Sequence, residues 1–347
     1  MKRFAVLMIA FLALGIWMSA CSPAATQTVE APTAAAPAAT ATLVPATATL
    51  QPTSTTAPTA TQAPSATPAL FSFTDVRGNK VTLAQPAQRI ISLAPSNTEI
   101  LYAVGAGAQV VARDDFSNYP AEAAALPTVG GSMTQYNLEE ITKLQPDLLL
   151  VSPLTSPEQI KALQEITPNV YVLENPKTLD ELYANLVMVG ALTGHAPEAE
   201  VLATNLEARA RAVLDKVAGV SEKPKVFYEL DATDPAKPWT AGPGTFIDLL
   251  IGLAGGENVG SALGSEWAQI SQEELIVQDP AIILLGDALY GGITPESVAS
   301  RPGWDAIQAV KNQKVFTFND DLVSRPGPRM IDGLEELAKA IHPELFE

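Results

Sequence analysis

The segment PEAEVLATNLEARARAVLDKVA, residues 197–218, decides the architecture that the sequence predicts. Apolar residues recur in it at steps of three and four, which predicts one apolar stripe along a helix. Pro197 suits a first helical turn, and Gly219 follows the predicted end. A helix of this length spans roughly 30 Å, about the width of a small domain. We therefore interpret it as a rigid rod that joins two lobes.

Short apolar segments alternate with helical patterns on both sides of the rod. The predicted buried strands are Arg89–Leu93, Val110–Ala112, Leu148–Val151, Val170–Leu173, Val226–Leu230, Ile282–Leu285 and Val315–Phe318. Such alternation predicts parallel sheets covered by helices on both faces. A helix capped by Ser96 or Asn97 should follow the first of these strands, and another should cover 304–310. The expected fold class is α/β, with an N-terminal lobe over residues 71–176, connecting helices over 177–218 and a C-terminal lobe over 219–347.

An internal repeat supports the two lobes. The segment NLEEI at 137–141 recurs as SQEEL at 271–275, and each copy is followed by a proline and a buried strand. Both copies predict a capped helix, with Glu140 and Glu274 as the capping-box partners. Glu139 and Glu273 have no such role. They either favour the helix dipole, an effect of about 0.3–1 kcal/mol, or form a two-point docking site with one glutamate in each lobe.

The first seventy residues differ in composition from the rest. A basic start and the apolar run 4–17 predict a secretory signal over residues 1–20, too short for a convincing membrane span. Met18-Ser19-Ala20-Cys21 resembles a bacterial lipobox, in which Cys21 becomes the lipidated first residue; the alternative is an ordinary signal peptide with an incidental cysteine. Residues 21–70 are almost entirely Ala, Thr, Pro and Ser, which predicts a disordered tether.

Composition excludes several classes of function. The net charge is −17 and no Lys/Arg-rich run exists, which argues against nucleic acid and against electrostatic docking on anionic lipid. The chain has two histidines, His195 and His342, without the clustering that a metal centre requires. It has no G-x-S-x-G motif, and Cys21 is its only cysteine, so neither covalent catalysis nor a disulfide framework is expected.

Aromatic residues in Gly/Pro/Ser-rich stretches are the remaining candidates for a functional site. They are Phe116, Tyr119, Tyr136, Trp239, Trp267, Tyr290 and Trp304. Taken one at a time, each is more often a core residue than a ligand contact. Several lie near predicted C-terminal ends of strands, where open α/β sheets bind ligands.

The chain from about Arg89 to Phe346 resembles the substrate-binding proteins of ABC importers for iron–siderophores, haem and vitamin B12. In that family, two α/β lobes are joined by one long helix. The resemblance depends on the order and spacing of RIISLAPSNTE at 89–99, FSNYP at 116–120, Gly130-Gly131, NLEEITKLQPDLLLV at 137–151, WAQIS at 267–271 and RPGPR at 325–329. The order of these motifs looks closest to that of the vitamin B12 binders.

The resemblance implies roles for individual residues. Glu139 and Glu273 match a glutamate pair that meets arginines on the membrane permease. Ligand contacts are implied at Phe116, Met133, Ser152, Trp239, Trp267, Asp321 and Arg325. Phe116 replaces a tyrosine of that family, and Met133 and Ser152 stand where tryptophans are expected. A corrinoid, a corrinoid precursor, a ferric siderophore and haem stay open as ligands.

The sequence therefore predicts an extracytoplasmic, lipid-anchored monomer that captures a metal chelate and delivers it to an ABC permease and its ATPase. Since the chelate arrives preassembled, neither an intrinsic cofactor nor a protein metal ligand is expected. An unkinked rod should allow only a small closing motion. Two other classes stay open: an enzyme on the same fold, which the lack of a nucleophile–base pair disfavours, and a surface sensor or adhesion module, which only the tether supports.

Overall fold

The computed structural model describes residues 71–131 and 135–346. They lie in one compact unit that extends from Ser65 to the C-terminus. The expected signal peptide, the tether with Cys21, and Met133 lie outside the described residues. None of the helices within the described ranges is long and apolar enough to cross a membrane.

The first lobe is built on a four-stranded parallel sheet with the strand order β4-β3-β5-β6. Every residue of β3 and β5 is buried, as expected for parallel strands covered on both faces. The strands are β3 Ile90–Leu93, β4 Val110–Arg113, β5 Leu148–Val151 and β6 Val170–Val172. An antiparallel hairpin, β1 Phe71–Thr74 and β2 Lys80–Leu83, precedes them. The short helices that connect the strands are α1 Pro95–Ala103, η1 Gly107–Gln109, α2 Ala121–Ala124, α3 Leu138–Leu144 and α4 Pro157–Gln164.

The second lobe repeats this plan with the strand order β12-β11-β7-β9, again with all pairs parallel. The strands are β7 Lys225–Glu229, β9 Glu257–Asn258, β11 Ile282–Leu285 and β12 Val315–Thr317. A separate antiparallel pair consists of β8 Trp239–Ala241 and β10 Trp267–Gln269. The helical elements are α7 Phe246–Leu253, η2 Val259–Leu263, α8 Gln272–Gln278, α9 Ala288–Gly291, α10 Pro295–Ala299, η3 Trp304–Ala306, α11 Gln308–Lys311, α12 Asp321–Ser324 and η4 Pro343–Leu345.

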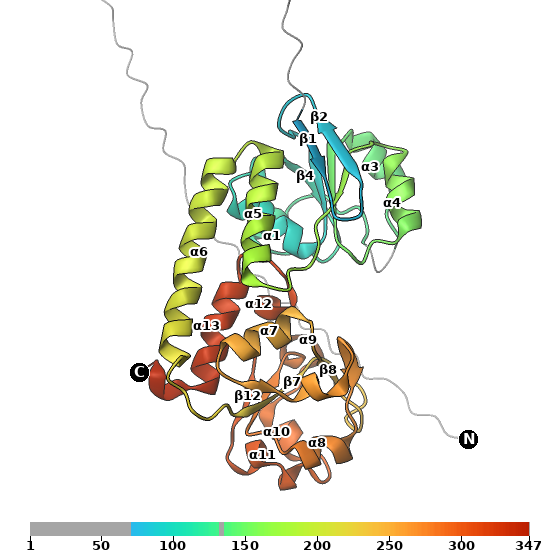
Figure 1. Ribbon diagram of the computed structural model, residues 1–347. Helices are drawn as coiled ribbons and strands as arrows, with labels where there is room; N and C mark the ends of the chain where they lie inside the picture. Colours follow the sequence, from blue (N-terminus) through green and yellow to red (C-terminus); the bar gives the residue numbers. More distant parts are fainter. Residues whose placement is uncertain (1–70, 132–134, 347) are drawn as a thin grey trace, which may run out of the picture. The chain divides into compact units, whose positions relative to one another are not determined.

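Three long helices lie where the lobes meet: α5 Leu179–Thr193, α6 Ala196–Val217 and α13 Met330–Ile341. Helix α6 is the predicted rod, and Figure 1 shows it beside α5 at one end and α13 at the other. Its buried stripe is Ala199, Ala203, Leu206, Ala210 and Val213. The crossing of α5 and α6 is tight, because a Cβ atom on Gly190 would lie 2.4 Å from the Cβ of Ala199. The two-lobe α/β fold with one long linking helix is thus confirmed.

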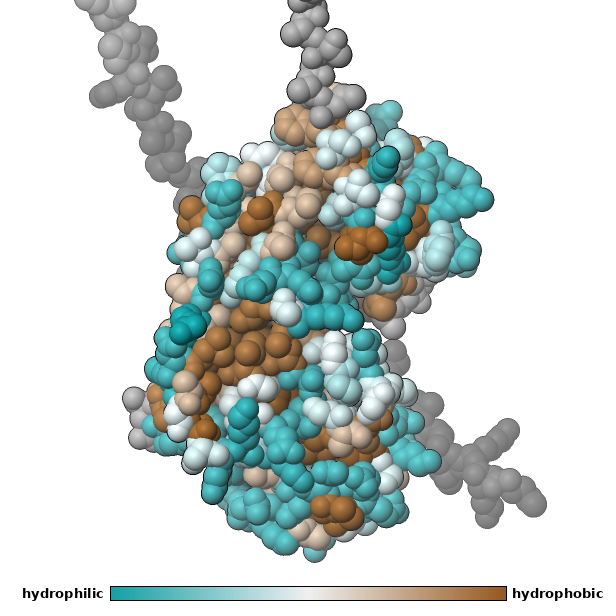
Figure 2. Space-filling model, in the orientation of Figure 1, coloured by the Kyte–Doolittle hydropathy of each residue, from teal (hydrophilic) through white to brown (hydrophobic). Residues whose placement is uncertain are grey.

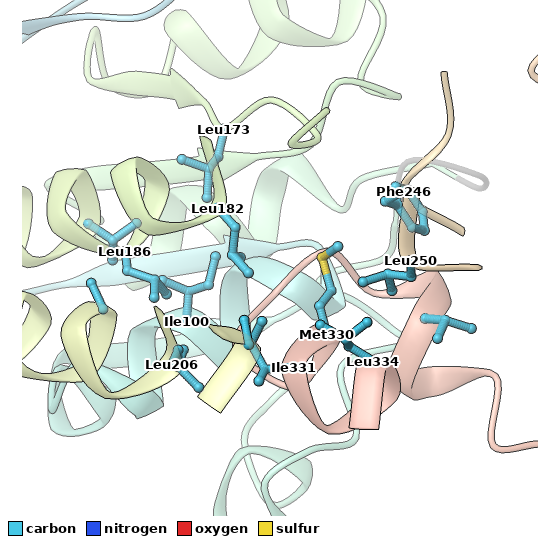
Figure 3. Close-up of a cluster of buried hydrophobic side chains, with 14 of the residues drawn as sticks. Ile100, Leu173, Leu182, Leu186, Leu206, Phe246, Leu250, Met330, Ile331 and Leu334 are labelled. Carbon is cyan, nitrogen blue, oxygen red and sulfur yellow. The ribbon is translucent and has the colours of Figure 1, made fainter. Parts of the chain in front are cut away.

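A single hydrophobic cluster continues from one lobe into the other. Figure 3 shows Ile100, Leu182 and Leu206 on one side and Phe246 and Leu250 on the other. Met330, Ile331 and Leu334 of α13 lie between these two groups in the same view. The buried hydrophobic residues of α1, α5, α6, α7 and α13 belong to one cluster, so these helices pack together between the two sheets.

The internal repeat forms equivalent helices, α3 and α8. The side chains of Asn137 and Ser271 accept hydrogen bonds from the backbone N–H groups three residues on. Both helices end at a residue in the left-handed conformation, Gln145 with φ 48° and Asp279 with φ 47°. The prediction that Glu140 and Glu274 complete capping boxes, by accepting hydrogen bonds from the N-cap backbone N–H groups, is wrong. Within the described residues, the Glu140 carboxylate lies 3.7 Å from Lys143, and Glu274 Oε1 accepts from Gln278 at 2.7 Å.

Two local predictions are also wrong. Helix α1 begins earlier than expected, with Ala94 as its N-cap and no side-chain cap, because Pro95 suits the first helical position. The single helix predicted over 304–310 is instead the short 3₁₀-helix η3 followed by α11. The two are separated by Ile307, whose backbone is extended.

Candidate ligand-binding site

The residues that follow the four strands of the first sheet lie together at the C-terminal edge of that sheet. Ser96 lies in the first turn of α1, which follows β3 directly; the loop after β4 carries Asp114 and Phe116, and the loop after β5 carries Ser152 and Leu154. Asn175 follows β6. Because parallel strands end together, side chains far apart in the sequence converge at this edge, where ligands bind in open α/β sheets.

The second lobe contributes an aromatic surface on β8 and β10. Trp267 pairs with Ala241, and Gln269 pairs with Trp239, so the two tryptophans lie diagonally on the same face of the pair. Both indoles are close to half exposed, at 43% for Trp267 and 42% for Trp239. The sequence interpretation placed them on loops and missed these strands.

Gly242 makes the β8–β10 pairing possible. Its N–H donates to the carbonyl of Glu266 at 2.8 Å, which extends the pair beyond Ala241. A Cβ atom at this position would lie 2.0 Å from the carbonyl oxygen of Ser265, so a larger residue would push the strands apart. The glycine thereby fixes Trp267, whose ring makes an edge contact with Phe246 at a centroid distance of 6.0 Å.

These loops and strands enclose a cavity of about 420 Å³ between the lobes. Its wall is largely apolar and aromatic. The lining residues are Ala94, Pro95, Ser96, Asp114, Phe116, Ser152, Pro153, Leu154, Asn175, Phe246, Trp267, Ser324, Arg325 and Pro326. In the part of the wall that the structure describes, the charged side chains are Asp114 and Arg325.

Asp114 organises the loop that carries Phe116. The carboxylate accepts a hydrogen bond from the Phe116 N–H at 3.1 Å and another from the Ser117 hydroxyl. Ser117 and Thr98 are hydrogen bonded at 2.7 Å, and Thr98 donates to Ser92 at 2.7 Å, so a buried polar chain connects the loop to β3. Burial raises the pKa of the Asp114 carboxyl, although these hydrogen bonds and Arg113 partly lower it. The half-exposed Phe116 ring is thus presented on an ordered backbone.

Arg325 enters the cavity from α12 with its charge already paired. Its guanidinium lies 2.9 Å from Asp321 and 3.3 Å from Glu99, and it donates to Asn118 at 2.7 Å. Asp321 also accepts a hydrogen bond from Tyr290 at 2.6 Å. The cavity is therefore polar at this end without offering an unpaired positive charge.

Four of the seven residues predicted to contact ligand line this cavity: Phe116, Ser152, Trp267 and Arg325. Asp321 holds Arg325, while Trp239 lies outside the lining on the shared face of β8 and β10. Sequence reasoning missed Asp114, Leu154 and Phe246. Asp114 and Leu154 follow β4 and β5 closely, and that position was a signal that could have identified them.

Glu139 and Glu273 occupy equivalent positions in the first turns of α3 and α8, and both are exposed. Glu139 forms an ion pair with Lys143 of the same helix at 2.8 Å. Trp304 and Tyr136, two of the aromatic candidates, are core residues. Among the described residues, no group of three or more His, Cys, Asp or Glu could hold a metal ion.

A second hollow, of about 560 Å³, lies between α5, α6 and α7. Leu179, Leu214, Leu249 and Leu253 line it, and Figure 2 shows hydrophobic surface over α7 in this region. Although it is the larger of the two, it lies away from the C-terminal ends of the strands, and Tyr183 supplies the one aromatic ring in the described part of its wall. The cavity between the lobes is therefore the better candidate for ligand binding.

The family of the chain follows from its sequence match. Residues 90–322 match the model of the periplasmic binding protein family, so the chain belongs to this extracytoplasmic family. It is an ABC-type substrate-binding protein rather than an enzyme.

Individual relatives agree with this assignment. The chain is 32% identical over 278 residues to the uncharacterized ABC transporter substrate-binding lipoprotein YvrC of Bacillus subtilis, covering 79% of this chain and 86% of the relative. It is 31% identical over 259 residues to a vitamin B12-binding protein of Vibrio cholerae, covering 73% and 88%. Among solved structures, the periplasmic heme-binding protein RhuT from Roseiflexus sp. RS-1 is similar, with a TM-score of 0.67, 26% identity and coverage of 75% and 99%.

Proposed function

We propose that this protein captures a preassembled metal chelate between its lobes, with cobalamin or a related corrinoid as the favoured ligand, and delivers it to an ABC permease and its ATPase. The observation that carries the proposal is the aromatic cavity at the C-terminal strand ends. Phe116 and Trp267 face it from opposite lobes. Aromatic rings favour contact with the broad apolar surface of a macrocycle.

The charge of the cavity favours a corrinoid over haem or a catecholate siderophore. Haem carries two propionates and a ferric catecholate carries several negative charges, so unpaired cations in the site would favour either ligand. Arg325 is the cationic side chain in the described part of the wall, and Glu99 and Asp321 already neutralise it. The side chains of a corrinoid are mostly uncharged amides, which suit Ser96, Ser152 and Asn175. The vitamin B12-binding relative supports the same choice.

The alternative ligand is a ferric siderophore or haem, bound in the same role. The likeness to the heme-binding structure from Roseiflexus supports this alternative. Incubation of the purified protein with cyanocobalamin, haem or a ferric siderophore, followed by gel filtration and absorbance, separates the candidates because each chelate is coloured. We expect cobalamin to co-elute with the protein. Retention of haem or siderophore alone would contradict the corrinoid assignment, and retention of none would contradict the chelate-binding function.

The proposal includes attachment to the membrane through a lipid on Cys21 and docking on the permease through Glu139 and Glu273. The lipobox-like sequence before Cys21 and the lipoprotein name of the Bacillus relative support the anchor. The Cys21→Ser variant should be released or left unprocessed. Processed Cys21→Ser protein in the membrane fraction at the wild-type level would contradict the anchor.

A further inference from the structure

Four charged side chains from both lobes meet in one buried cluster. Glu99 belongs to α1 of the first lobe, and it accepts two hydrogen bonds from Arg329, at 2.8 and 2.5 Å. Arg325 lies 3.3 Å from the same carboxylate, and Asp321 pairs with Arg325 at 2.9 Å. These side chains are between 1% and 17% exposed. The cluster has two positive and two negative groups, so it is electrically balanced.

Uncharged groups of the first lobe complete the cluster. Asn118 accepts a hydrogen bond from Arg325 at 2.7 Å, and the guanidinium of Arg329 lies 4.1 Å above the ring of Tyr119. Both residues lie in the loop that Asp114 orders. The segment 325–329, which follows α12, is thus held against α1 and this loop of the opposite lobe. It forms a second connection between the lobes in addition to α6.

The cluster separates two hollows. Arg325 lines the 420 Å³ ligand cavity on one side. A separate hollow of about 380 Å³ lies on the other side of the cluster. It is lined by Glu99, Tyr119 and Arg329, and by Leu202, Leu206 and Arg209 of α6. A change in the angle between the lobes must therefore displace the cluster. Because Arg325 shares the Glu99 carboxylate with Arg329, its position in the cavity depends on that contact.

We propose that Glu99 and Arg329 form an interlobe brace that fixes the angle between the lobes and positions Arg325 for the ligand. A buried ion pair adds little net stability compared with apolar packing, but breaking it leaves an uncompensated charge, so only one arrangement of the lobes satisfies all four groups. Glu99 does not contact the ligand cavity itself and acts through Arg325. The positioning of Arg325 rests on the proposed ligand-binding function, whereas the brace does not.

The chain offers a matched control. Glu229 and Arg301 form another buried bidentate ion pair, at 2.5 and 2.8 Å, that lies entirely within the second lobe. Glu99→Gln and Glu229→Gln each remove one buried charge and should lower the melting temperature to a similar extent. Only Glu99→Gln should weaken cyanocobalamin binding, by roughly tenfold, as is typical for residues that couple sites indirectly. In an Arg325→Ala background, Glu99→Gln should cause no further loss of affinity.

A second readout needs no ligand. Because Cys21 is the only cysteine in the chain, spin labels can be attached through Lys161→Cys and Asp305→Cys in a Cys21→Ser background; both positions are exposed, one in each lobe. Glu99→Gln should broaden the distribution of distances between the labels, and Glu229→Gln should not. Should Glu99→Gln fail to fold, Asn118→Ala, which alters an exposed loop residue, tests the same connection.

The outcomes distinguish the two proposals. An unchanged distance distribution in Glu99→Gln overturns the brace. Additive losses of affinity from Glu99→Gln and Arg325→Ala overturn the positioning of Arg325. If the wild-type protein binds none of the chelates, the proposed function fails, and the distance distribution still decides whether the brace exists.

Discussion

Trp267 is the residue that tests the aromatic site most directly. It lines the cavity with its indole partly exposed, so its removal takes away ligand contact without opening a core void. We expect Trp267→Ala to weaken cobalamin binding by about 1–3 kcal/mol, in the range for an aromatic anchor, and to change the melting temperature little. Trp239→Ala should cost less, because Trp239 lies outside the cavity lining. Absorbance titration of the two variants measures both effects.

Trp304 is the matched control for these substitutions. It is fully buried, and its ring packs against Phe227 and the guanidinium of Arg301. Trp304→Ala should lower the free energy of unfolding by about 3–5 kcal/mol and leave the affinity of the folded fraction intact. If Trp267→Ala behaves in the same way, Trp267 is a core residue and the site assignment is wrong.

Asp287 should make stability depend on pH. Burial, followed by repulsion from Glu229, raises the pKa of its carboxyl to about 6. Since the pKa in the unfolded chain is about 3.9, the folded state binds more protons between about pH 4 and pH 6. The free energy of unfolding therefore falls as the pH rises through this window, and above it the full cost of burying the charge is present.

Asp287→Asn removes this ionisation. Within the described residues, Asp287 Oδ1 is buried without a hydrogen-bond partner, while Oδ2 accepts from the Ala232 N–H at 3.0 Å, a bond that an amide oxygen can keep. We expect the variant to be more stable than wild type by about 1–3 kcal/mol at pH 7.5, with the difference vanishing near pH 4. Chemical denaturation at several pH values measures it. A constant difference would show that Asp287 does not titrate in this range.

At the scale of single elements, a regular apolar stripe or an uninterrupted apolar run allowed prediction. Helix α6 has such a stripe, and the buried strands β5 and β11 are such runs, and the structure confirms all three. Strands β8 and β10 have three residues each, too few to show a period, and Gly242 reads as a turn residue in isolation. Their pairing follows from tertiary contacts, so Trp239 and Trp267 were identified as aromatic candidates but placed on loops.

Helices α3 and α8 are equivalent in backbone but not in charge. Glu139 is 80% exposed and pairs with Lys143 on its own helix. In α8 the position equivalent to Lys143 carries Val277, so Glu273 has no lysine at the corresponding place. In docking on arginines, Glu139 must exchange an existing ion pair and Glu273 need not. We expect Glu273→Ala to reduce uptake more than Glu139→Ala, and Lys143→Ala to strengthen docking by about twofold. Uptake through the reconstituted permease measures all three.

The double variant Glu139→Ala with Glu273→Ala tests the docking role itself. Both side chains are exposed and neither caps its helix, so cobalamin affinity and melting temperature should stay at the wild-type level. Uptake should fall sharply, and reversal of both residues to Arg should lower it further. Normal uptake by the double variant would contradict docking through these glutamates.

At the scale of the whole molecule, the sequence predicted two lobes and a rod but not the cluster that joins them. Glu99 and Arg329 are 230 residues apart in the sequence, and no local pattern relates them. The segment RPGPR at 325–329 is recognisable as a motif in the sequence, and Arg325 was predicted to contact the ligand. The contact of Arg329 with α1 required the three-dimensional arrangement, because it depends on how α13 packs between α6 and α7.

Two connections therefore limit the motion between the lobes. Helix α6 is held to α13 by Arg209, which donates to Asp332 at 2.6 Å and to Glu335 at 2.9 and 2.8 Å. The brace of Glu99 and Arg329 joins the lobes a second time. Hinge closure needs a few residues that can absorb a large change of backbone angles, and a continuous helix with a buried ionic contact beside it provides none. Ligand binding should thus close the cavity only slightly.

This expectation is measurable with the label pair at Lys161 and Asp305. Addition of cyanocobalamin should shift the mean distance between the labels by no more than about 2 Å. Ala208→Pro is the control, because Ala208 is exposed in the middle of α6 and proline removes a backbone hydrogen bond and kinks the helix. The kinked variant should show a broader distribution and a larger shift on ligand addition. A shift of roughly 5 Å or more in the wild-type protein, equal to that of Ala208→Pro, would show that neither the rod nor the brace restrains the lobes.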